Sequence, residues 1–81
     1  MQVVGYCIYK NKQYVIFKDL NCFKITDGFH DKVINEKNME RYKYYKQADK
    51  QDIDLKKIIN RMRGTRPWHP LLNIFRKEGV L

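Results

Sequence analysis

The sequence predicts a small α+β domain, in which an N-terminal three-stranded antiparallel meander is followed by two to three short helices. Two observations support this prediction. β-Branched and aromatic residues with period-two alternation dominate the opening third of the chain, and helically spaced apolar residues dominate the closing third. Because 81 residues suit one domain, we treat 1–81 as a single unit, with a strand region over 1–34 and a basic helical region over 35–81.

Two strands are expected over residues 3–9 and 14–17, joined by a tight turn at residues 11–12. In that register Cys7 faces Ile16 across the hairpin. Alternation then predicts a core face made of Tyr6, Ile8, Val15 and Phe17. The opposite face is mixed and carries Cys7, Tyr9, Tyr14, Ile16 and Lys18.

A third strand is expected over residues 22–26, after a turn at residues 19–21. Asp27 and Gly28 end this strand, since both residue types favour turns. Residues 29–34 fit either a strand or a loop, so three strands are the simplest prediction.

From Asn35 the pattern changes to that of a helix. Asn35 or Asn38 can cap the helix, and residues 39–50 contain no glycine or proline. The apolar residues of this segment do not fall on one stripe, which predicts a helix whose tyrosines lie between the protein body and solvent.

The second predicted helix has the clearest pattern in the chain. Asp52 is expected to cap it and Gly64 to end it. Its apolar stripe, at helical spacing, is formed by Leu55, Ile58, Ile59 and Met62. A short third helix is expected from Pro70 to Gly79, with its inward side formed by Leu71, Ile74 and Phe75.

Positive charge is concentrated in the second half of the chain. Residues 1–40 contain six Lys and Arg against five Asp and Glu, whereas residues 41–81 contain eleven against four. The second half therefore carries nearly all of the formal net charge of +8. A one-sided positive field of this kind attracts polyanions, so the asymmetry predicts a nucleic-acid-binding surface.

Two segments supply the candidate nucleic-acid-binding residues. The first predicted helix combines cations that bind phosphates with rings that stack on unpaired bases, in Arg41, Lys43, Tyr44, Tyr45 and Lys46. The second helix has a cationic flank opposite its apolar stripe, in Lys56, Lys57, Arg61, Arg63 and Arg66. The competing explanation for both segments is an ordinary solvated helix surface. The absence of any acid from Lys56 to Lys77 favours a functional surface in the second.

Trp68 lies in a loop between two prolines, Pro67 and Pro70. An exposed tryptophan there would serve as an anchor for a partner protein. In a domain this small, the indole is more often needed in the core, so the sequence favours Trp68 packed against the sheet.

Catalytic and metal-binding patterns are weak. Asp27, His30 and Asp31 place carboxylates near an imidazole, as a small basic ribonuclease requires, but no activated nucleophile or nucleotide-cradling glycine loop accompanies them. Cysteine and histidine occur at spacings of 15, 8 and 39 residues, which match no metal motif, in Cys7, Cys22, His30 and His69. We therefore expect no catalytic residues, no metal and no cofactor.

The sequence thus predicts a small non-catalytic basic protein that binds nucleic acid, alone or as an accessory component of a nucleoprotein complex. DNA and RNA stay equally open, as does the oligomeric state. The alternative is a small inhibitor or adaptor, of the kind that phages and mobile elements encode, that binds an acidic surface of a larger protein. Neither function needs a small-molecule substrate or a membrane. The absence of a secretory signal predicts an intracellular protein with free thiols.

Overall fold

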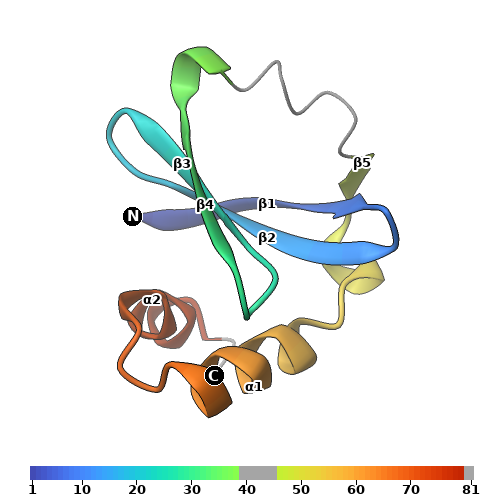
Figure 1. Cartoon of the computed structure of the whole chain (residues 1–81), viewed down its shortest axis with the longest axis vertical. Coiled ribbons are helices and arrows are strands. Elements are labelled where there is room, and N and C mark those ends of the chain that lie inside the picture. The colour runs from blue at the N-terminus through green and yellow to red at the C-terminus, as the bar shows by residue number, and fades with distance from the viewer. Residues whose placement is uncertain (39–45, 80–81) are drawn as a thin grey trace.

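The computed structural model describes residues 1–38 and 46–79, which form a five-stranded antiparallel sheet with two helices over one face (Figure 1). The strand order is β4-β3-β2-β1-β5. The strands are β1 (Gln2–Tyr9), β2 (Lys12–Lys18), β3 (Cys22–Thr26), β4 (Asp31–Asn35) and β5 (Lys46–Ala48). The α+β class is confirmed, but the described sheet has two more strands than the predicted meander.

The β1–β2 hairpin turns one residue earlier than predicted. Lys10 and Asn11 adopt φ values of 50° and 63°, and Tyr9 pairs with Lys12. Two consecutive positive φ angles characterise a type I′ turn, whose twist matches that of a hairpin. Cys7 consequently pairs with Tyr14 and not with Ile16. The predicted partners were wrong, yet the predicted faces survive, because the pairing shifts by two positions and side chains alternate with a period of two.

A β-bulge near the start of β1 changes which face its first residues occupy. Val3 pairs with Phe17, but Gly5 pairs with Ile16, so one extra residue of β1 is inserted between them. Val3 therefore packs against the helix side of the sheet, and Val4 is exposed.

Residues 29–34, which fitted either a strand or a loop, contain both. Phe29 and His30 lie in the turn, and β4 then pairs antiparallel with β3 from Thr26↔Asp31 to Cys22↔Asn35. Figure 1 shows β3 and β4 crossing β1 and β2 at a steep angle, as expected for a strongly twisted sheet.

The helix predicted over residues 39–50 is wrong for its described part. Residues 46–48 form β5, which pairs with Tyr6, Cys7 and Ile8 of β1. A short 3₁₀ turn, Lys50–Asp52, follows β5. The rest of the predicted helix, residues 39–45, lies outside the described residues.

Each face of the sheet carries a cluster of buried residues. On the helix face, Val15 and Phe17 pack against both helices, with Tyr6 and Ile8 at the margin, as predicted. The face expected to be mixed is a second core cluster, formed by Cys7, Tyr14, Ile16, Ile25 and Ile34. Burial of each large apolar side chain stabilises the fold by about 1.5–3 kcal/mol, so both clusters contribute strongly.

Helix α1 (Leu55–Thr65) carries its predicted stripe inward, with Ile58, Ile59 and Met62 buried. Asp54, not Asp52, is the N-cap, because its carboxylate accepts the Lys57 N–H. Gly64 does not end the helix, which continues to Thr65.

Helix α2 (Pro70–Lys77) buries Leu71, Leu72 and Phe75. The Phe75 ring meets the Phe17 ring edge to face, with centres 5.3 Å apart. Ile74, predicted inward, is only partly buried against the same cluster.

Two polar contacts set where the helices lie on the sheet. Gln13 of β2 accepts the Asp54 N–H at 2.7 Å and donates to the Asp52 carbonyl at 3.3 Å, which holds the start of α1 beside the hairpin end. At the other end of the layer, the Val3 N–H of β1 donates to Glu78 Oε1 at 2.9 Å.

Candidate functional site

The solvent side of α1 carries the cations that the sequence assigned to a nucleic-acid surface. Lys56, Lys57 and Arg63 are exposed, while Ile58 on the opposite side is buried. At 100° per residue, Lys56 and Arg63 fall on one flank of the helix and Arg61 on the other, with Lys57 between them. The cations therefore surround the solvent side of α1 and do not form a single row.

Helix α2 covers the same sheet face as α1 and extends the charge excess (Figure 1). Its Arg76 and Lys77 are exposed. Neither was among the predicted binding residues, although the spacing of the apolar Leu71 and Phe75 implies that they face outward. We call the five exposed cations of the two helices the basic helix surface: Lys56, Lys57, Arg63, Arg76 and Lys77.

Arg61, another predicted phosphate ligand, turns toward the sheet and is only partly exposed. Its guanidinium donates to the Asp27 carbonyl at 3.3 Å and lies 5.4 Å from the centre of the Phe29 ring. Part of its hydrogen-bonding capacity is thus used within the protein.

The turn between β3 and β4 holds Phe29 and His30 beside α1. Asp27 Oδ1 accepts the N–H groups of both residues at 2.8 Å, which rigidifies the turn. Gly28 has φ 99°, and a Cβ at this position would lie 2.5 Å from the Ile58 carbonyl oxygen. The turn approaches the helix this closely because residue 28 has no side chain.

Asp27 and His30 form an open histidine–aspartate pair. The Asp27 carboxylate is buried, whereas the His30 side chain is 79% exposed, and 3.7 Å separate Oδ2 from Nδ1. Burial alone would raise the pKa of Asp27, but the bonds from the His30 and Phe29 N–H groups outweigh it and hold the pKa below its ordinary value. A carboxylate charged at neutral pH therefore lies beside an accessible imidazole.

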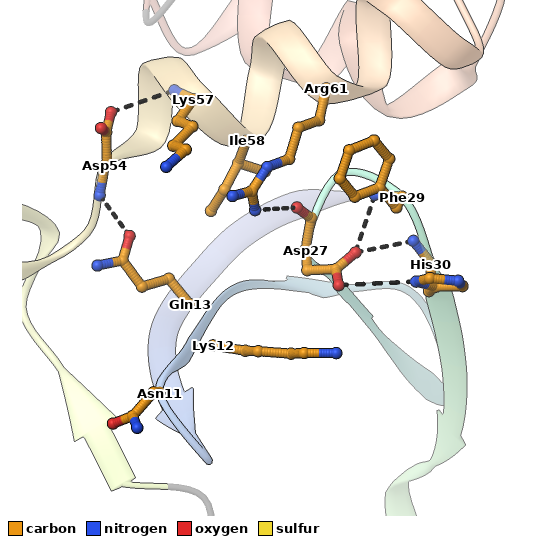
Figure 2. Close-up of a pocket in the computed structure, with 10 residues that line it drawn as sticks. All are labelled: Asn11, Lys12, Gln13, Asp27, Phe29, His30, Asp54, Lys57, Ile58 and Arg61. Atoms are coloured by element: carbon orange, nitrogen blue, oxygen red, sulfur yellow. Dashed lines mark hydrogen bonds and ion pairs between the residues drawn. The ribbon is translucent and has the colours of Figure 1, made fainter.

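A cleft of about 480 Å³ opens between the end of the β1–β2 hairpin, the β3–β4 turn and the first turns of α1 (Figure 2). Lys57 reaches into it from α1 and Lys12 from β2. Arg61 is the third cation of the lining, and the carboxylates are Asp27 and Asp54. Both carboxylates already accept backbone N–H groups, so the cleft combines a small positive excess with mixed polarity.

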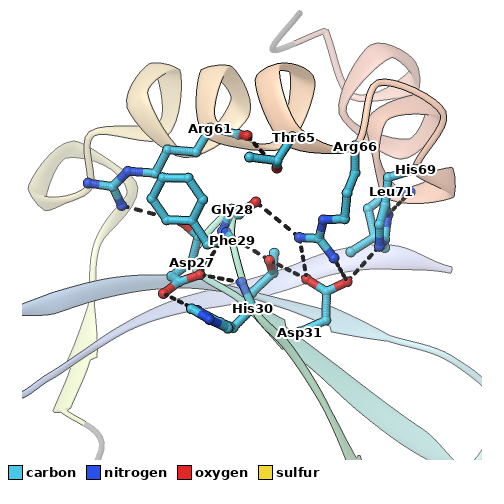
Figure 3. Close-up of polar contacts among 11 residues, drawn as sticks. Asp27, Gly28, Phe29, His30, Asp31, Arg61, Thr65, Arg66, His69 and Leu71 are labelled. Atoms are coloured by element: carbon cyan, nitrogen blue, oxygen red, sulfur yellow. Dashed lines mark hydrogen bonds and ion pairs between the residues drawn. The ribbon is translucent and has the colours of Figure 1, made fainter.

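Arg66 is partly buried and ion-paired, whereas the sequence predicted an outward-facing phosphate ligand. Its NH1 and NH2 groups donate to the two oxygens of Asp31 at 2.8 and 3.1 Å, and NH2 also donates to the Gly28 carbonyl at 3.0 Å (Figure 3). Both partners of this ion pair are largely buried. The positive charge that the sequence assigned to the surface is neutralised here by an acid of the strand region.

Asp31 also accepts from His69 Nε2 at 2.5 Å (Figure 3). It accepts from the Thr26 hydroxyl at 2.6 Å. His69 Nδ1 accepts the Leu71 N–H at the start of α2, so the ring proton that binds Asp31 sits on Nε2. Burial alone would raise the pKa of Asp31, but the bonds from Arg66, Thr26 and His69 hold it below the ordinary value. We call Thr26, Asp31, Arg66 and His69 the internal polar cluster.

The remaining predicted binding residues do not join α1. Lys46 is exposed on β5, on the opposite edge of the sheet from β4, where it pairs with Ile8. Arg41, Lys43, Tyr44 and Tyr45 lie outside the described residues.

Trp68 is exposed, and the expectation that it packs against the sheet is wrong. Its exposed fraction is 76%, in the loop between α1 and α2. The core volume that a tryptophan would supply comes instead from Phe17 and Phe75.

Within residues 1–38 and 46–79, no three His, Cys, Asp or Glu side chains cluster closely enough to hold a metal ion. Neither α1 nor α2 is long and apolar enough to cross a membrane, and no other described helix is. Cys7 and Cys22 are free thiols, and burial raises the pKa of Cys7 to about 11.

No family model, no curated protein and no solved structure matches this chain. Its chemistry therefore rests on the arrangement of the residues described above.

Proposed function

We propose that this protein is a small non-catalytic module that binds nucleic acid through the basic helix surface. The observation that carries this proposal is the distribution of charge over the helices: five exposed cations lie on α1 and α2, and no acid occurs from Lys56 to Lys77. A patch of one sign attracts phosphates and releases condensed counterions when it binds them.

Two features support a docking role for this surface. The apolar stripes of both helices are buried against Val15 and Phe17, so the cations are presented by a rigid layer and not by a mobile tail. Arg66 is bound bidentately to Asp31, so the basic helix surface consists of three lysines and two arginines. Lysine contacts phosphate as a point charge, so we expect affinity with little sequence preference.

The salt dependence of oligonucleotide binding tests this proposal. With about four phosphate contacts, the logarithm of the association constant should fall against the logarithm of salt concentration with a slope of roughly −3 to −4. Fluorescence anisotropy from about 50 to 300 mM KCl measures this slope. An affinity that does not change with salt would contradict the proposal.

Charge reversal locates the surface. Lys56→Glu combined with Arg63→Glu should weaken binding by at least roughly tenfold, because both contacts are lost and repulsion is added. The matched control is Lys37→Glu combined with Lys32→Glu, which changes the net charge equally at exposed positions outside α1 and α2. Equal weakening by both double variants would indicate a general charge effect without a defined surface.

A second function, binding of an acidic protein surface by an inhibitor or adaptor, is favoured by one observation. Trp68 presents its exposed ring in the same layer as the cations, and Trp and Arg are the commonest anchors at protein interfaces. A partner captured from nuclease-treated lysate by the parent protein and lost with Trp68→Ala would favour this function. Oligonucleotide affinity unchanged by Trp68→Ala would separate the two roles.

A further inference from the structure

We propose that the cleft beside α1 receives one unpaired nucleotide of a single-stranded nucleic acid, with its base against Phe29 and its phosphate bound by Lys12. This inference deepens the proposed function and rests on it. It goes further in two respects. It assigns a ligand to the cleft, which lies beside the basic helix surface, and it predicts a preference for single strands over duplexes.

The size of the cleft suits one nucleotide. Its volume of about 480 Å³ lies within the usual range of small-ligand sites. Its walls come from three separate elements, the hairpin end, the β3–β4 turn and α1 (Figure 2). A duplex keeps its bases paired and stacked, so only a single strand or a flipped base can enter such a space.

Phe29 provides the platform for the base. Its side chain is about half exposed although it is a large apolar group at the rim of the cleft. The Arg61 guanidinium lies over the ring and is itself held by the Asp27 carbonyl. Because Asp27 also fixes the Phe29 N–H, the ring and the guanidinium are positioned before any base arrives. Aromatic rings and guanidinium planes are the two groups on which single-stranded bases stack.

The charges of the cleft favour a nucleotide over a simple anion. Lys12 and Lys57 enter from opposite walls, and Figure 2 shows their ammonium groups directed to different parts of the cleft, with Lys12 extending toward the β3–β4 turn that carries Phe29. A phosphate can therefore bind Lys12 while the base lies at Phe29. Asp54, also in the lining, opposes a bare anion. Carboxylates do accept hydrogen bonds from the amino groups of bases. A ligand that is anionic at one end and carries donors at the other therefore matches the mixed lining.

The test compares a single-stranded oligonucleotide of about 12 nucleotides with a hairpin duplex, by anisotropy at fixed salt. Phe29→Leu, which keeps an apolar side chain but removes the ring, should weaken single-strand binding by roughly tenfold and leave duplex binding unchanged. Phe29→Tyr should restore single-strand binding, which excludes a loss caused by misfolding. Circular dichroism verifies that each variant is folded.

Lys12→Gln tests the phosphate site, with Lys10→Gln as the matched control. Both lysines are exposed at the end of the same hairpin, but Lys10 lies over the Tyr9 ring and does not line the cleft. We expect Lys12→Gln to weaken single-strand binding by about three- to tenfold more than Lys10→Gln does.

The outcomes separate this inference from the proposed function. If the parent protein binds no oligonucleotide, both fail. If Lys56→Glu with Arg63→Glu abolishes binding while Phe29→Leu and Lys12→Gln have no effect, the basic helix surface stands and the cleft proposal is overturned. Equal losses for single strand and duplex in Phe29→Leu would also overturn it.

Discussion

Two histidine–aspartate pairs flank the same β-turn, and they have opposite characters. Asp31 and His69 lie 2.5 Å apart, each less than a fifth exposed, and Arg66 completes their charge balance. Asp27 and His30 lie 3.7 Å apart, and His30 is almost fully open to solvent beside the cleft. The first pair joins the strands to the helices. The second leaves an imidazole free to meet a ligand.

The comparison teaches that residue types alone do not distinguish a structural pair from an accessible one. The distinction comes from the groups around each aspartate. Asp31 accepts hydrogen bonds from Arg66 and His69 in the α1–α2 connection, 35 and 38 positions away. It therefore acts as a joint, by which we mean that it links β4 to the helix layer. Asp27 receives backbone N–H groups from its own turn, and so shapes that turn without closing the cleft. Three predictions test this division of roles, beginning with the largest effect.

Asp31→Asn should cause the largest loss, about 3–5 kcal/mol of unfolding free energy near neutral pH, because it leaves the buried Arg66 charge without its partner. The pKa of Asp31 in the folded protein is lowered from its ordinary value of 3.8. Its carboxylate therefore stabilises the fold fully at pH values above 3.8, and this stabilisation is lost as the pH falls through the lowered pKa. The stability gap between parent and variant should therefore be full near neutral pH and close in acid. Urea unfolding at several pH values measures the gap.

A gap that stays constant down to acid pH would contradict the role of Asp31 as a charged joint. Arg66→Met combined with Asp31→Leu serves as the control, since removing both charges avoids an unpaired buried ion and should cost less than Asp31→Asn.

Gly28→Ala should cost the next largest amount, about 2–4 kcal/mol, from the strain of a positive φ and from overpacking against α1. The Cβ would lie 2.5 Å from the Ile58 carbonyl oxygen and 2.8 Å from Arg61 Cβ. Gly64→Ala is the matched control, because nothing lies within 4 Å of its Cβ position in α1. That substitution should stabilise the protein by up to about 1 kcal/mol. Thermal unfolding of both variants measures the contrast, and a tolerated Gly28→Ala would show that the turn can move away from α1.

The two histidines give the smallest effects and the most direct contrast. His69→Ala should cost about 1–2 kcal/mol, since it removes the bond to Asp31 and the cap that accepts the Leu71 N–H. His30→Ala should change stability by less than about 0.5 kcal/mol, as expected for an exposed side chain. Chemical denaturation of the two variants tests the contrast, and an equal loss would remove the distinction between the joint and the open pair.

Local patterns in the sequence were sufficient for much of the fold. The stripe of Leu55, Ile58, Ile59 and Met62 identified α1, and alternation identified the helix face of β1 and β2. Each of these predictions depends on residues close in sequence, whose spacing specifies a single buried side. The α+β class followed from the same patterns.

Features that depend on distant partners were missed. β5 has only three residues, Lys46–Ala48, and is a strand because β1 lies beside it. Arg66 looked like an outward cation because nothing near it in sequence indicates that Asp31 lies within hydrogen-bond distance. Trp68 was predicted to lie in the core because of its size. The sequence does not show that Phe17 and Phe75 already fill the space between the sheet and the helices. The cleft combines residues 12, 29 and 57, and no local motif relates them.

The bond from the Val3 N–H to Glu78 has a consequence for how this chain acquires its fold. It joins positions 75 apart, and β1, which it anchors, lies between two other strands. Contacts so distant in sequence form late and slow the folding rate, because a long loop must close before they contribute. During synthesis this bond can form only after the residues through Glu78 have left the ribosome, and the apolar side of the β1–β2 hairpin stays uncovered until the two helices pack on it.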